Sequence, residues 1–533
     1  MSGKRISSVW VAVLGVVIGA LLVVTIQKAT ENNRRLDAQY RDWRKLNLVL
    51  QKVDEMYVDT VDHKNVTDAA ITAALSRLDP HSVYMPPAEL EESETDLAGN
   101  FDGIGIQFNV PNDTAIVLEV IPGGPSEKIG MMPGDRLLRV DEKVIAGVKF
   151  PQDSMVRRMK GPAGTKVTVT VLRDGVEIPF EITRGKIPVH CVDAAFMVDD
   201  RTGYIRLSKF SRTTHTEVLN AAIDLLAEGM KHLVFDIRDN TGGYLDQALL
   251  LSNLFLDRGD LIVYMEGLHR KREEYKADGR GILKNIELTV LINESSASSS
   301  EIFAGAIQDN DRGVIVGRRS FGKGLVQEPV YFTDGSGIRL TVARFYTPSG
   351  RCIQKPYSDD YQYDIIKRYN DGEMTEADSI KVDRSEEFLT KGGRKVYGGG
   401  GIIPDVFVPM DTTLATNFYV ACNRKATSMR FASDYFDRHK SELGAIDDYN
   451  ELLKYLDSSS MESRFLAFAK EKDGLSPESD AEWAETRPYL MPQVKALVGR
   501  YSKLGDKAFY HLYLEVDDTF EEAMKPHRIV TER

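Results

Sequence analysis

Cysteine is scarce in this sequence, and the few cysteines form no pattern of metal or disulfide type. Cys191, Cys352 and Cys422 lie far apart without a CxxC pair, so the sequence shows neither a zinc motif nor a disulfide framework. An odd count leaves at least one of them unpaired within the chain. There is also no HExxH motif and no histidine–carboxylate cluster with ligand spacing, so we expect no metal site.

Concentrated positive charge is missing as well. The 533 residues include 68 Lys and Arg against 80 Asp and Glu, a net charge of −12, and no basic stripe stands out. This argues against nucleic acid as a partner. A composition of 42% hydrophobic and 28% charged residues is typical of globular proteins with substantial cores. The length suits roughly three or four domains.

One long stretch without charge stands at the N-terminus. Residues 9–26 contain no charged side chain, and these eighteen residues are just enough for a helix that spans a bilayer. No clear A-x-A cleavage site follows, and the basic tail with Lys4 and Arg5 would normally stay in the cytoplasm. We therefore expect residues 1–31 to anchor the chain in the inner membrane, with the rest on the periplasmic side. A cleaved signal is the alternative.

Residues 32–96 have a helical pattern that a proline-rich segment interrupts. The segment LDPHSVYMPP at residues 78–87 contains three prolines, which do not continue a helix. We interpret residues 32–96 as a helical packing or dimerisation element. His81, next to Pro80, is interpreted as a turn residue rather than a ligand or a base.

Residues 97–185 carry the signals of a small β-rich module. Apolar residues alternate in GIGIQF, and Asp174-Gly175 between two apolar runs is a strong hairpin signal. A short helix is expected over residues 152–159. This order of elements resembles a PDZ domain, although a β module that only packs against its neighbours is the alternative.

The PDZ resemblance implies a peptide-binding site. In PDZ domains the loop before the second strand receives a C-terminal carboxylate on backbone N–H groups, and the ligand adds as a further strand. The corresponding residues here are Gly103, Ile104, Gly105 and Ile106. Lys160 is a further candidate residue of this site, or it is simply an exposed lysine at a helix end.

Residues 186–410 alternate between strand and helix patterns, which predicts βαβ units with a site beyond the carboxyl ends of the strands. We expect strands over residues 204–207, 233–237, 288–292, 314–316 and 338–346, and helices over 216–230, 245–256 and 302–307. The charged segment 355–397 is predicted to be a surface insertion. Residues 411–533 are predicted to be a helical domain for docking or oligomerisation.

A serine-rich turn lies between one expected strand and the next helix. Five of the six residues 295–300 are serine, and a serine at a helix N-terminus has free backbone N–H groups nearby that favour an oxyanion. This suggests a nucleophile. No GxSxG elbow occurs and no histidine is near in sequence, but FGKG offers Lys323 as a base. Lysine can act in this way only when burial lowers its pKa.

The segment NESSASSSEI, followed by FGKG, resembles the active-site signature of the C-terminal processing peptidases, also called tail-specific proteases. The family's serine position falls on Ser298, its lysine on Lys323 (25 residues later) and its supporting glutamine on Gln327. LDPHSxY, RxNxGG, TPSGR and GIxPD occur in the family's order, so the resemblance covers residues 36–409. Ser295 and Ser299 replace residues that are usually glycine and alanine, and Ser296 or Ser300 are the alternative nucleophiles.

The resemblance implies a multidomain α/β (α+β) fold. A crotonase- or ClpP-like βαβ protease core would carry an inserted PDZ domain and helical N- and C-terminal regions. It implies a serine endopeptidase without a cofactor, in which Ser298 attacks, Lys323 is the base and Gln327 orients it. The N–H of Ser299 and one from Gly242-Gly243 would form the oxyanion hole.

The expected substrates are polypeptides with free, apolar C-termini. The resemblance also implies a homodimer or larger oligomer, and an adaptor that delivers substrates is left open. Two other functions are considered. One is a non-proteolytic PDZ scaffold with a degenerate core, and the other is an envelope housekeeping protease without tail selectivity.

Overall fold

The computed structural model describes residues 43–110, 113–358, 360–412 and 416–527. The predicted anchor at residues 9–26 lies outside these described residues. Across them, no helix combines the length and the apolar character that crossing a membrane requires. The chain divides into two compact units, Met1–Arg77 and Leu78–Arg533.

The first unit is helical where it is described. One helix covers residues 43–56, and α2 (His63–Leu75) is capped by Asp62, whose carboxylate accepts from the N–H of Asn65 at 3.1 Å. Large apolar side chains are exposed here, among them Met56 and Val58, with exposed fractions of 76% and 86%. Such a surface suits a protein partner, but the dimerisation role stays a prediction.

The β-rich module contains an antiparallel sheet and two helices. Its strand order is β3-β4-β5-β7-β8, which leaves β3 at an edge, while β2 pairs separately with β9. Asp174 and Gly175 both have positive φ (51° and 80°), as the predicted two-residue hairpin turn requires. The elements are β2 (Asn100–Gly103), β3 (Ile106–Asn109), β4 (Ala115–Val120), α4 (Pro125–Lys128), β5 (Arg136–Val140), β6 (Lys143–Val144), α5 (Gln152–Met159), β7 (Lys166–Arg173), β8 (Val176–Thr183) and β9 (Gly185–Pro188).

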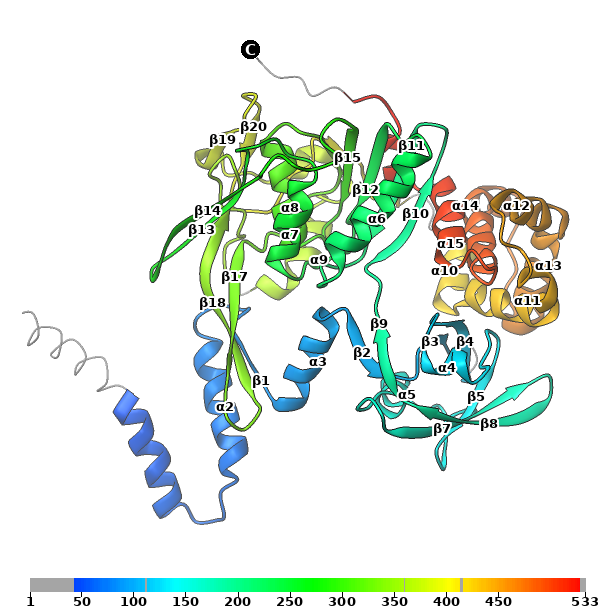
Figure 1. Ribbon diagram of the computed structural model, residues 1–533, viewed down its shortest axis with the longest axis horizontal. Coiled ribbons are helices and arrows are strands. Elements are labelled where there is room, and N and C mark those ends of the chain that lie inside the picture. The colour runs from blue at the N-terminus through cyan, green and yellow to red at the C-terminus, as the bar shows by residue number, and fades with distance from the viewer. Residues whose placement is uncertain (1–42, 111–112, 359, 413–415, 528–533) are drawn as a thin grey trace, which may run out of the picture. The chain divides into compact units, whose positions relative to one another are not determined.

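A six-stranded sheet is the centre of the following region (Figure 1). Only β10 runs antiparallel to its neighbour β11, and the remaining strands are parallel, so their carboxyl ends lie at one edge of the sheet. The strands, in spatial order, are β10 (Val192–Met197), β11 (Thr202–Leu207), β12 (His232–Asp236), β15 (Glu287–Ile292), β16 (Val314–Gly317) and β21 (Val406–Phe407).

Both faces of this sheet are buried, because alternate residues of its strands enter different cores. Leu233 and Phe235 belong to the core that includes α6, α7 and α8, whereas Val234 between them packs with the C-terminal α16. The helices are α6 (Thr214–Ala227), α7 (Leu245–Asn253) and α8 (Ser299–Asp309). Their positions confirm the predicted α/β class.

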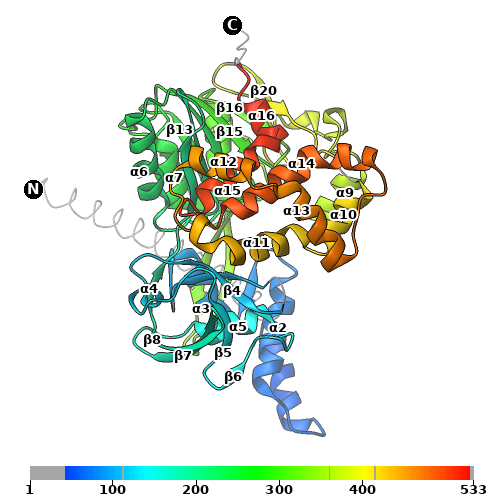
Figure 2. The same ribbon diagram turned by 90° about the vertical axis from the view of Figure 1, so that its right-hand side faces the viewer.

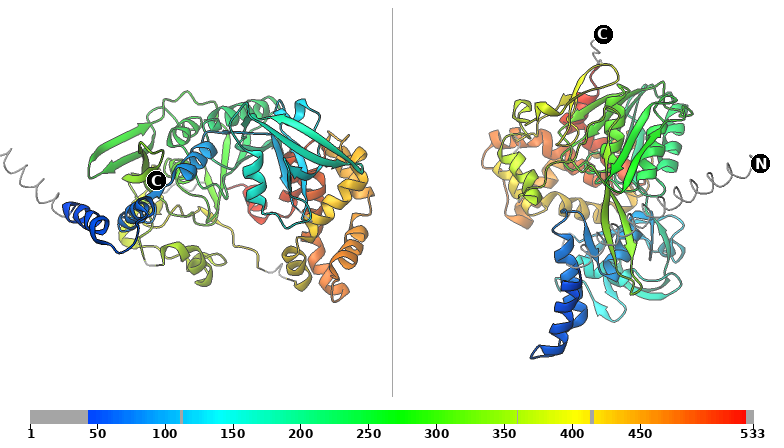
Figure 3. Two further views of the ribbon diagram at one scale, coloured as in Figure 1. Left: turned by 90° about the horizontal axis from the view of Figure 1, so that it is seen from below. Right: turned by 90° about the vertical axis from the view of Figure 1, so that its left-hand side faces the viewer.

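A second sheet stands beside the first and carries the strand that follows the expected lysine base. Its strands are β1 (Val83–Met85), β18 (Gly337–Tyr346), β13 (Leu261–Gly267) and β14 (Arg270–Lys276) in spatial order, with β17 (Leu325–Tyr331) also paired to β18. The β17–β18 ribbon is the long yellow-green pair of strands in Figure 3. Helix α3 (Pro87–Leu97) follows β1.

The charged segment 355–397 folds against the region that precedes Lys323. Arg368 and Glu373 are buried in it, so its charge pattern does not mark a purely exposed insertion. Its elements are η1 (Tyr361–Tyr363), α9 (Asp364–Asn370), η2 (Ala377–Ser379), η3 (Arg384–Glu386), β19 (Glu387–Leu389) and β20 (Lys395–Tyr397).

The C-terminal region is helical and has a hydrophobic core of its own (Figure 2). Its last helix contributes instead to the sheet, where Phe520 packs edge-on against the ring of Tyr204 at 5.8 Å. The elements are α10 (Asn417–Arg424), α11 (Thr427–Leu443), α12 (Tyr449–Ser458), α13 (Met461–Phe468), η4 (Ala469–Asp473), α14 (Asp480–Gly499), α15 (Asp506–Tyr513), η5 (Leu514–Val516) and α16 (Asp518–Ala523).

Candidate active site

Ser298 occupies a strained turn between β15 and α8. It is the residue immediately before the helix, and its φ of 57° and ψ of −113° are unusual for a residue with a side chain. Conformations of this kind are costly and cluster at functional sites. Ser298 is half-buried, and it has both the position and the backbone geometry expected of a nucleophile at a helix N-terminus.

The hydroxyls of the neighbouring serines are engaged by backbone carbonyls. Ser296 donates to the Ile237 carbonyl at 2.8 Å, and Ser300 donates to the Asn240 carbonyl at 2.8 Å. Both side chains are fully buried. Ser299 donates to the Gly243 carbonyl at 2.9 Å. These bonds explain why the turn is so rich in serine, and they disfavour Ser296 and Ser300 as alternative nucleophiles.

One buried carboxylate joins the serine turn (residues 295–300) to the lysine loop (residues 320–324). Oε2 of Glu301 accepts the backbone N–H of Ser298 at 2.8 Å and that of Lys323 at 2.9 Å. Oε1 of the same side chain accepts the Gly322 N–H at 2.7 Å and the Ser320 hydroxyl at 2.5 Å. Burial raises the pKa of Glu301, and these four hydrogen bonds oppose that rise.

Lys323 lies in an environment that favours its neutral form. Burial is the main cause that lowers the pKa of Lys323 below its ordinary value, and the positive charge of Arg339 adds to it. The negative charges of Glu301 and Asp79 act in the opposite direction. A lysine with a lowered pKa can accept a proton, which a solvated surface lysine cannot do at neutral pH.

The side chain of Gln327 is held by the turn that contains His81. Its Nε2 donates to the His81 carbonyl at 2.7 Å, which leaves the amide oxygen to face another donor. The His81 N–H in turn donates to Asp79 at 2.8 Å, as expected for a turn residue. Burial, with the charge of Lys323 as the next cause, lowers the pKa of His81 to about 4. His81 is therefore a neutral neighbour of the lysine.

A series of hydrogen bonds leads from His81 to Gly324, the residue after Lys323. The His81 ring and the Tyr361 hydroxyl are 2.7 Å apart, and Gln354 donates to the same hydroxyl at 3.2 Å. The Gly324 N–H donates to Gln354 Oε1 at 2.9 Å. A cavity of about 250 Å³ lies here, lined by Pro80, His81, Phe321, Lys355, Tyr361, Gln362 and Ile365.

Asn240 organises the turn that was expected to complete the oxyanion hole. Its side chain accepts the Gly242 N–H at 2.9 Å and donates to the Leu207 carbonyl at 2.9 Å. Its carbonyl accepts the Ala297 N–H at 3.0 Å, so the turn is attached directly to the serine segment. Because the Gly242 N–H is already used, Gly243 is the better placed of the two glycines to supply a donor.

Only glycine fits at these two positions. A Cβ at Gly242 would lie 2.8 Å from the Ser298 Cβ, and one at Gly243 would lie 2.1 Å from the Phe210 carbonyl oxygen. Both residues also have positive φ, 99° and 148°. Among the hydrogen bonds of the described residues, the N–H groups of Ser299 and Gly243 donate to no protein atom. These two donors remain available beside Ser298.

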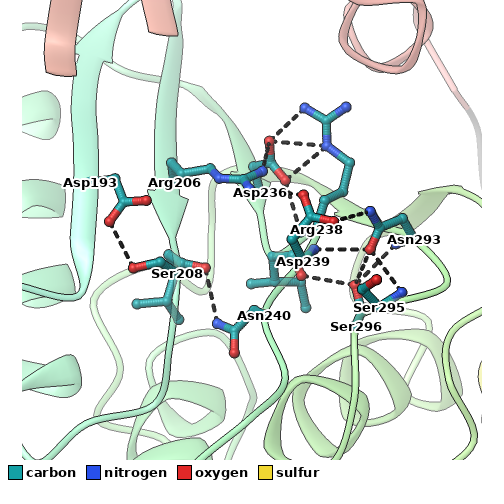
Figure 4. Close-up of polar contacts among 12 residues, drawn as sticks. Asp193, Arg206, Ser208, Asp236, Arg238, Asp239, Asn240, Asn293, Ser295 and Ser296 are labelled. Carbon is teal, nitrogen blue, oxygen red and sulfur yellow. Dashed lines mark hydrogen bonds and ion pairs between the residues drawn. The ribbon is translucent and has the colours of Figure 1, made fainter. Parts of the chain in front are cut away.

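An ionic network supports the turn of Gly242 and Gly243 from the side of strands β11 and β12 (Figure 4). Arg206 and Arg238 both contact Asp236, at 3.0 and 2.6 Å. The adjacent Asp239 exchanges two hydrogen bonds with Asn293, at 2.9 and 2.7 Å, and Asn293 Oδ1 also accepts the Ser295 N–H at 3.2 Å. The network therefore reaches from β12 to the start of the serine turn.

Of the residues predicted to bind a peptide end, Gly103 pairs with Gly185 of β9, whereas Ile106 begins the edge strand β3. Ile104 and Gly105 connect β2 to the edge strand β3, and their carbonyls accept from Ser126 and Ile121 at 3.0 and 3.1 Å. Gly105 has a φ of 80°. Lys160 ends α5 and places its ammonium 4.9 Å from the centre of the Phe101 ring. No residue of this module contributes to the contacts around Ser298 described above.

Several supporting residues were not assigned a role from the sequence. Glu301 belongs to the quoted serine motif, but its function depends on the approach of residues 320–323, which the sequence does not reveal. Asn240 belongs to the RxNxGG motif, and this motif could have been used to predict that Asn240 supports the site. Among the described residues, no group of three or more His, Cys, Asp or Glu side chains is arranged to hold a metal ion.

Comparison with family models gives three matches along the chain. Residues 201–364 match peptidase family S41, and residues 103–183 match the PDZ domain. Residues 418–502 match a family of unknown function. The first two matches cover the turn of Gly242, the serine turn, the lysine loop and the edge strand β3.

Curated relatives match more than half of the chain. A carboxy-terminal-processing protease of Bartonella bacilliformis is 34% identical over 346 residues, which cover 64% of this chain and 79% of the relative. The carboxy-terminal processing protease CtpA of Bacillus subtilis is 34% identical over 314 residues, 58% of this chain and 66% of the relative. A solved structure of a photosystem II D1 C-terminal processing protease is 28% identical, covers 69% of this chain and 86% of its own, and has a TM-score of 0.37.

Proposed function

The chain belongs to the carboxy-terminal-processing proteases of peptidase family S41, and from this premise we propose that Ser298, Lys323 and Gln327 are its catalytic residues. As a member of that family it is a serine endopeptidase with a PDZ domain. We also propose that the enzyme recognises the C-terminal tails of its substrates and that it lies on the periplasmic side of the inner membrane.

One observation carries the assignment. The backbone N–H groups of Ser298 and Lys323 donate to the same oxygen atom of Glu301, although the two residues are 25 positions apart. This holds the serine turn and the lysine loop in one fixed arrangement. The strained backbone of Ser298 and the lowered pKa of Lys323 support the same pair.

The mechanism follows from these groups. Neutral Lys323 accepts the proton of the Ser298 hydroxyl while Oγ attacks the peptide carbonyl. The N–H groups of Ser299 and Gly243 stabilise the oxyanion of the tetrahedral intermediate. The ammonium of Lys323 then protonates the leaving amine, and an acyl-enzyme on Ser298 remains. Water attacks this ester, again with Lys323 as the base, and the serine is regenerated.

Gln327 has a supporting part in this proposal. Because its Nε2 is used by the His81 carbonyl, its amide oxygen is the end that can accept from the lysine side chain. An acceptor at this place orients Nζ toward Ser298 without adding a negative charge. A carboxylate there would stabilise the ammonium and oppose the neutral base.

The PDZ domain supplies the proposed selectivity. Its edge strand β3 is open for an added strand, and the loop of Gly103, Ile104 and Gly105 precedes it. We expect it to bind the free carboxylate and the apolar last residues of a polypeptide, with Lys160 taking part in gating. The location on the periplasmic side of the inner membrane, with residues 9–26 as the anchor, is proposed from the sequence alone.

The test uses one unfolded reporter with an apolar C-terminus, either as the free carboxylate or amidated. Faster cleavage of the free form is expected, and equal cleavage would contradict tail recognition. Ser298→Ala and Lys323→Ala should abolish cleavage, whereas the matched control Ser295→Ala should retain it. Undiminished cleavage by either active-site variant would contradict the mechanism. A chelator should have no effect.

A further inference from the structure

The turn of residues 240–243 is called the oxyanion turn. The ionic network beside it includes a residue from the far end of the chain. Arg238 donates through Nη1 and Nη2 to the two carboxylate oxygens of Asp517, at 2.9 and 2.7 Å. The two residues are 279 positions apart. The geometry is that of a bidentate arginine–carboxylate pair, which fixes orientation as well as distance. The Asp517 side chain is 7% exposed and that of Arg238 is 15% exposed.

Asp517 gives the guanidinium of Arg238 a second carboxylate partner. Asp236 is completely buried and already accepts from both Arg206 and Arg238, and from the Tyr204 hydroxyl at 2.7 Å. Arg206 has a further carboxylate partner in the exposed Asp239, at 3.2 Å. Asp517 is the second carboxylate of Arg238, and without it Arg238 would keep a largely buried charge with too few acceptors.

The C-terminal segment around Asp517 is well fixed. Asp517 caps α16 by accepting the Phe520 N–H at 3.0 Å, and Phe520 is buried against the central sheet. Next to it, the Tyr510 hydroxyl of α15 donates to Asp193 at 3.2 Å, and the Arg206 guanidinium lies 5.6 Å from the centre of the Tyr510 ring. The carboxylate is thus presented to Arg238 by a docked helix and not by a free tail.

Arg238 is joined to the active site through the residues that follow it. Asp239, with a φ of 60°, bonds to Asn293 in front of the serine turn. Asn240 holds the Gly242 N–H and the serine segment at Ala297. A shift of the Arg238 side chain would therefore be transmitted to the turn that presents the Gly243 N–H.

We propose that Asp517 is a positioning residue of the protease, which holds the oxyanion turn in its catalytic geometry through Arg238. The inference rests on the proposed function, since it assigns a task to the Gly243 N–H. It makes the C-terminal helical region part of the active-site support. Stabilisation of the transition state, and not substrate binding, should depend on it.

The test measures kcat and KM on the tail reporter for the full-length variant Asp517→Asn. Asparagine still caps α16 but lacks the charge. We expect kcat to fall about ten- to hundredfold, as for a small misplacement of a catalytic group, while KM changes less than about twofold. A peptide boronic acid, which forms a tetrahedral adduct with an active serine, should lose affinity by a similar factor.

Three further variants separate positioning from a loss of structure. Asp517→Ser also keeps a capping side chain and should behave as Asp517→Asn does, so it serves if the first variant does not fold. Asp517→Glu should restore part of kcat. Asp518→Asn, at the exposed neighbouring position, should match the unmodified enzyme. Combining Asp517→Asn with Arg238→Gln should cost little beyond Arg238→Gln alone, because the two act through one pair.

Unchanged kcat and boronate affinity in Asp517→Asn would overturn the proposal, as would an equal loss in Asp518→Asn or a loss expressed only in KM. These outcomes are distinct from failure of the proposed function. If Ser298→Ala still cleaves the reporter, the assignment of the nucleophile fails. Boronate affinity does not depend on turnover of the reporter, so it tests Asp517 in either case.

Discussion

The lysine loop and the oxyanion turn both contact the serine turn, but they are anchored from different parts of the chain. The lysine loop is attached by Glu301, which lies three residues after Ser298 in the first turn of α8. The oxyanion turn is attached internally by Asn240 and externally by the pair of Arg238 and Asp517. The proposed nucleophile and its proposed base are thus held together within residues 298–323, whereas the proposed oxyanion turn is also attached to the C-terminal helical region.

Because of this difference, substitutions on the two sides of the site should cause two kinds of catalytic defect. Changes around Glu301 and Lys323 should alter the ionisation of the base and therefore the pH profile. Changes around Asn240 and Arg238 should lower the rate at every pH without moving the profile. The predictions that follow test whether the two sides behave independently.

The largest expected effect is that of pH on kcat. In the proposed mechanism the neutral form of Lys323 is the base, and burial lowers its pKa, so the rate should rise with pH and level off below the ordinary lysine value of about 10.4. Below the pKa the rate should fall about tenfold per pH unit. The positive charge of Arg339 also lowers this pKa, so Arg339→Gln should move the midpoint upward, while Arg339→Lys should not. A pH-independent rate would contradict the lysine base.

Glu301→Gln should be the most damaging substitution outside the proposed catalytic residues. The amide keeps the size of the side chain, but its NH2 group would face N–H groups that now donate to a carboxylate oxygen. We expect kcat to fall by about a hundredfold or more and the free energy of unfolding to fall by about 2–4 kcal/mol. Kinetics and denaturant unfolding would measure both.

The matched control for this substitution is Glu328→Gln. Its carboxylate pairs with Arg270 at a site where 46% of the side chain is exposed. It should change stability by less than about 1 kcal/mol. If Glu301→Gln were as mild as this control, Glu301 would not be the link between the two loops.

Asn240→Ala should reduce the rate by about ten- to a hundredfold with an unchanged pH profile. The substitution removes the acceptor of the Gly242 N–H and the donor to the Leu207 carbonyl in a fully buried place. Asn253→Ala, which removes exposed contacts with Asp278, is the control. A shifted pH midpoint in Asn240→Ala would show that the two sides of the site are coupled.

Ser299→Ala should have the smallest effect. It removes one hydrogen bond, from the hydroxyl to the Gly243 carbonyl, and leaves the backbone N–H that is proposed for the oxyanion. The expected cost is about 1 kcal/mol in stability, and kcat should stay within about threefold. A loss of more than tenfold would mean that the hydroxyl itself takes part in the reaction.

Much of the fold was predictable because its local signals agree with its tertiary packing. Asp174-Gly175 predicted a hairpin turn, and both residues have the positive φ that this turn requires. The strand over residues 288–292 and the helix after the serine turn correspond to β15 and α8. The assignments to the C-terminal processing peptidases, to the α/β class and to a serine endopeptidase are confirmed, whereas the catalytic residues, the domain limits and the cellular location stay predictions.

The same local signals do not reveal the buried charges of segment 355–397. Its charge density is typical of a surface insertion, but Arg368 and Glu373 are buried and paired at 2.7 Å. Arg368 also donates to the Arg319 carbonyl at 2.6 Å, close to the lysine loop. A charged side chain can be buried when its partners are supplied by another segment, and composition does not contain that information.

By itself, the sequence determined the type of chemistry, because a serine at a helix N-terminus and a glycine-flanked lysine at a set spacing are local features. Only the tertiary structure decided which groups support them. Glu301, Asn240 and Asp517 act by hydrogen bonds across 22, 57 and 279 positions of the chain. The direction and strength of such bonds depend on where the chain returns in space, and no pattern of neighbouring residues specifies that.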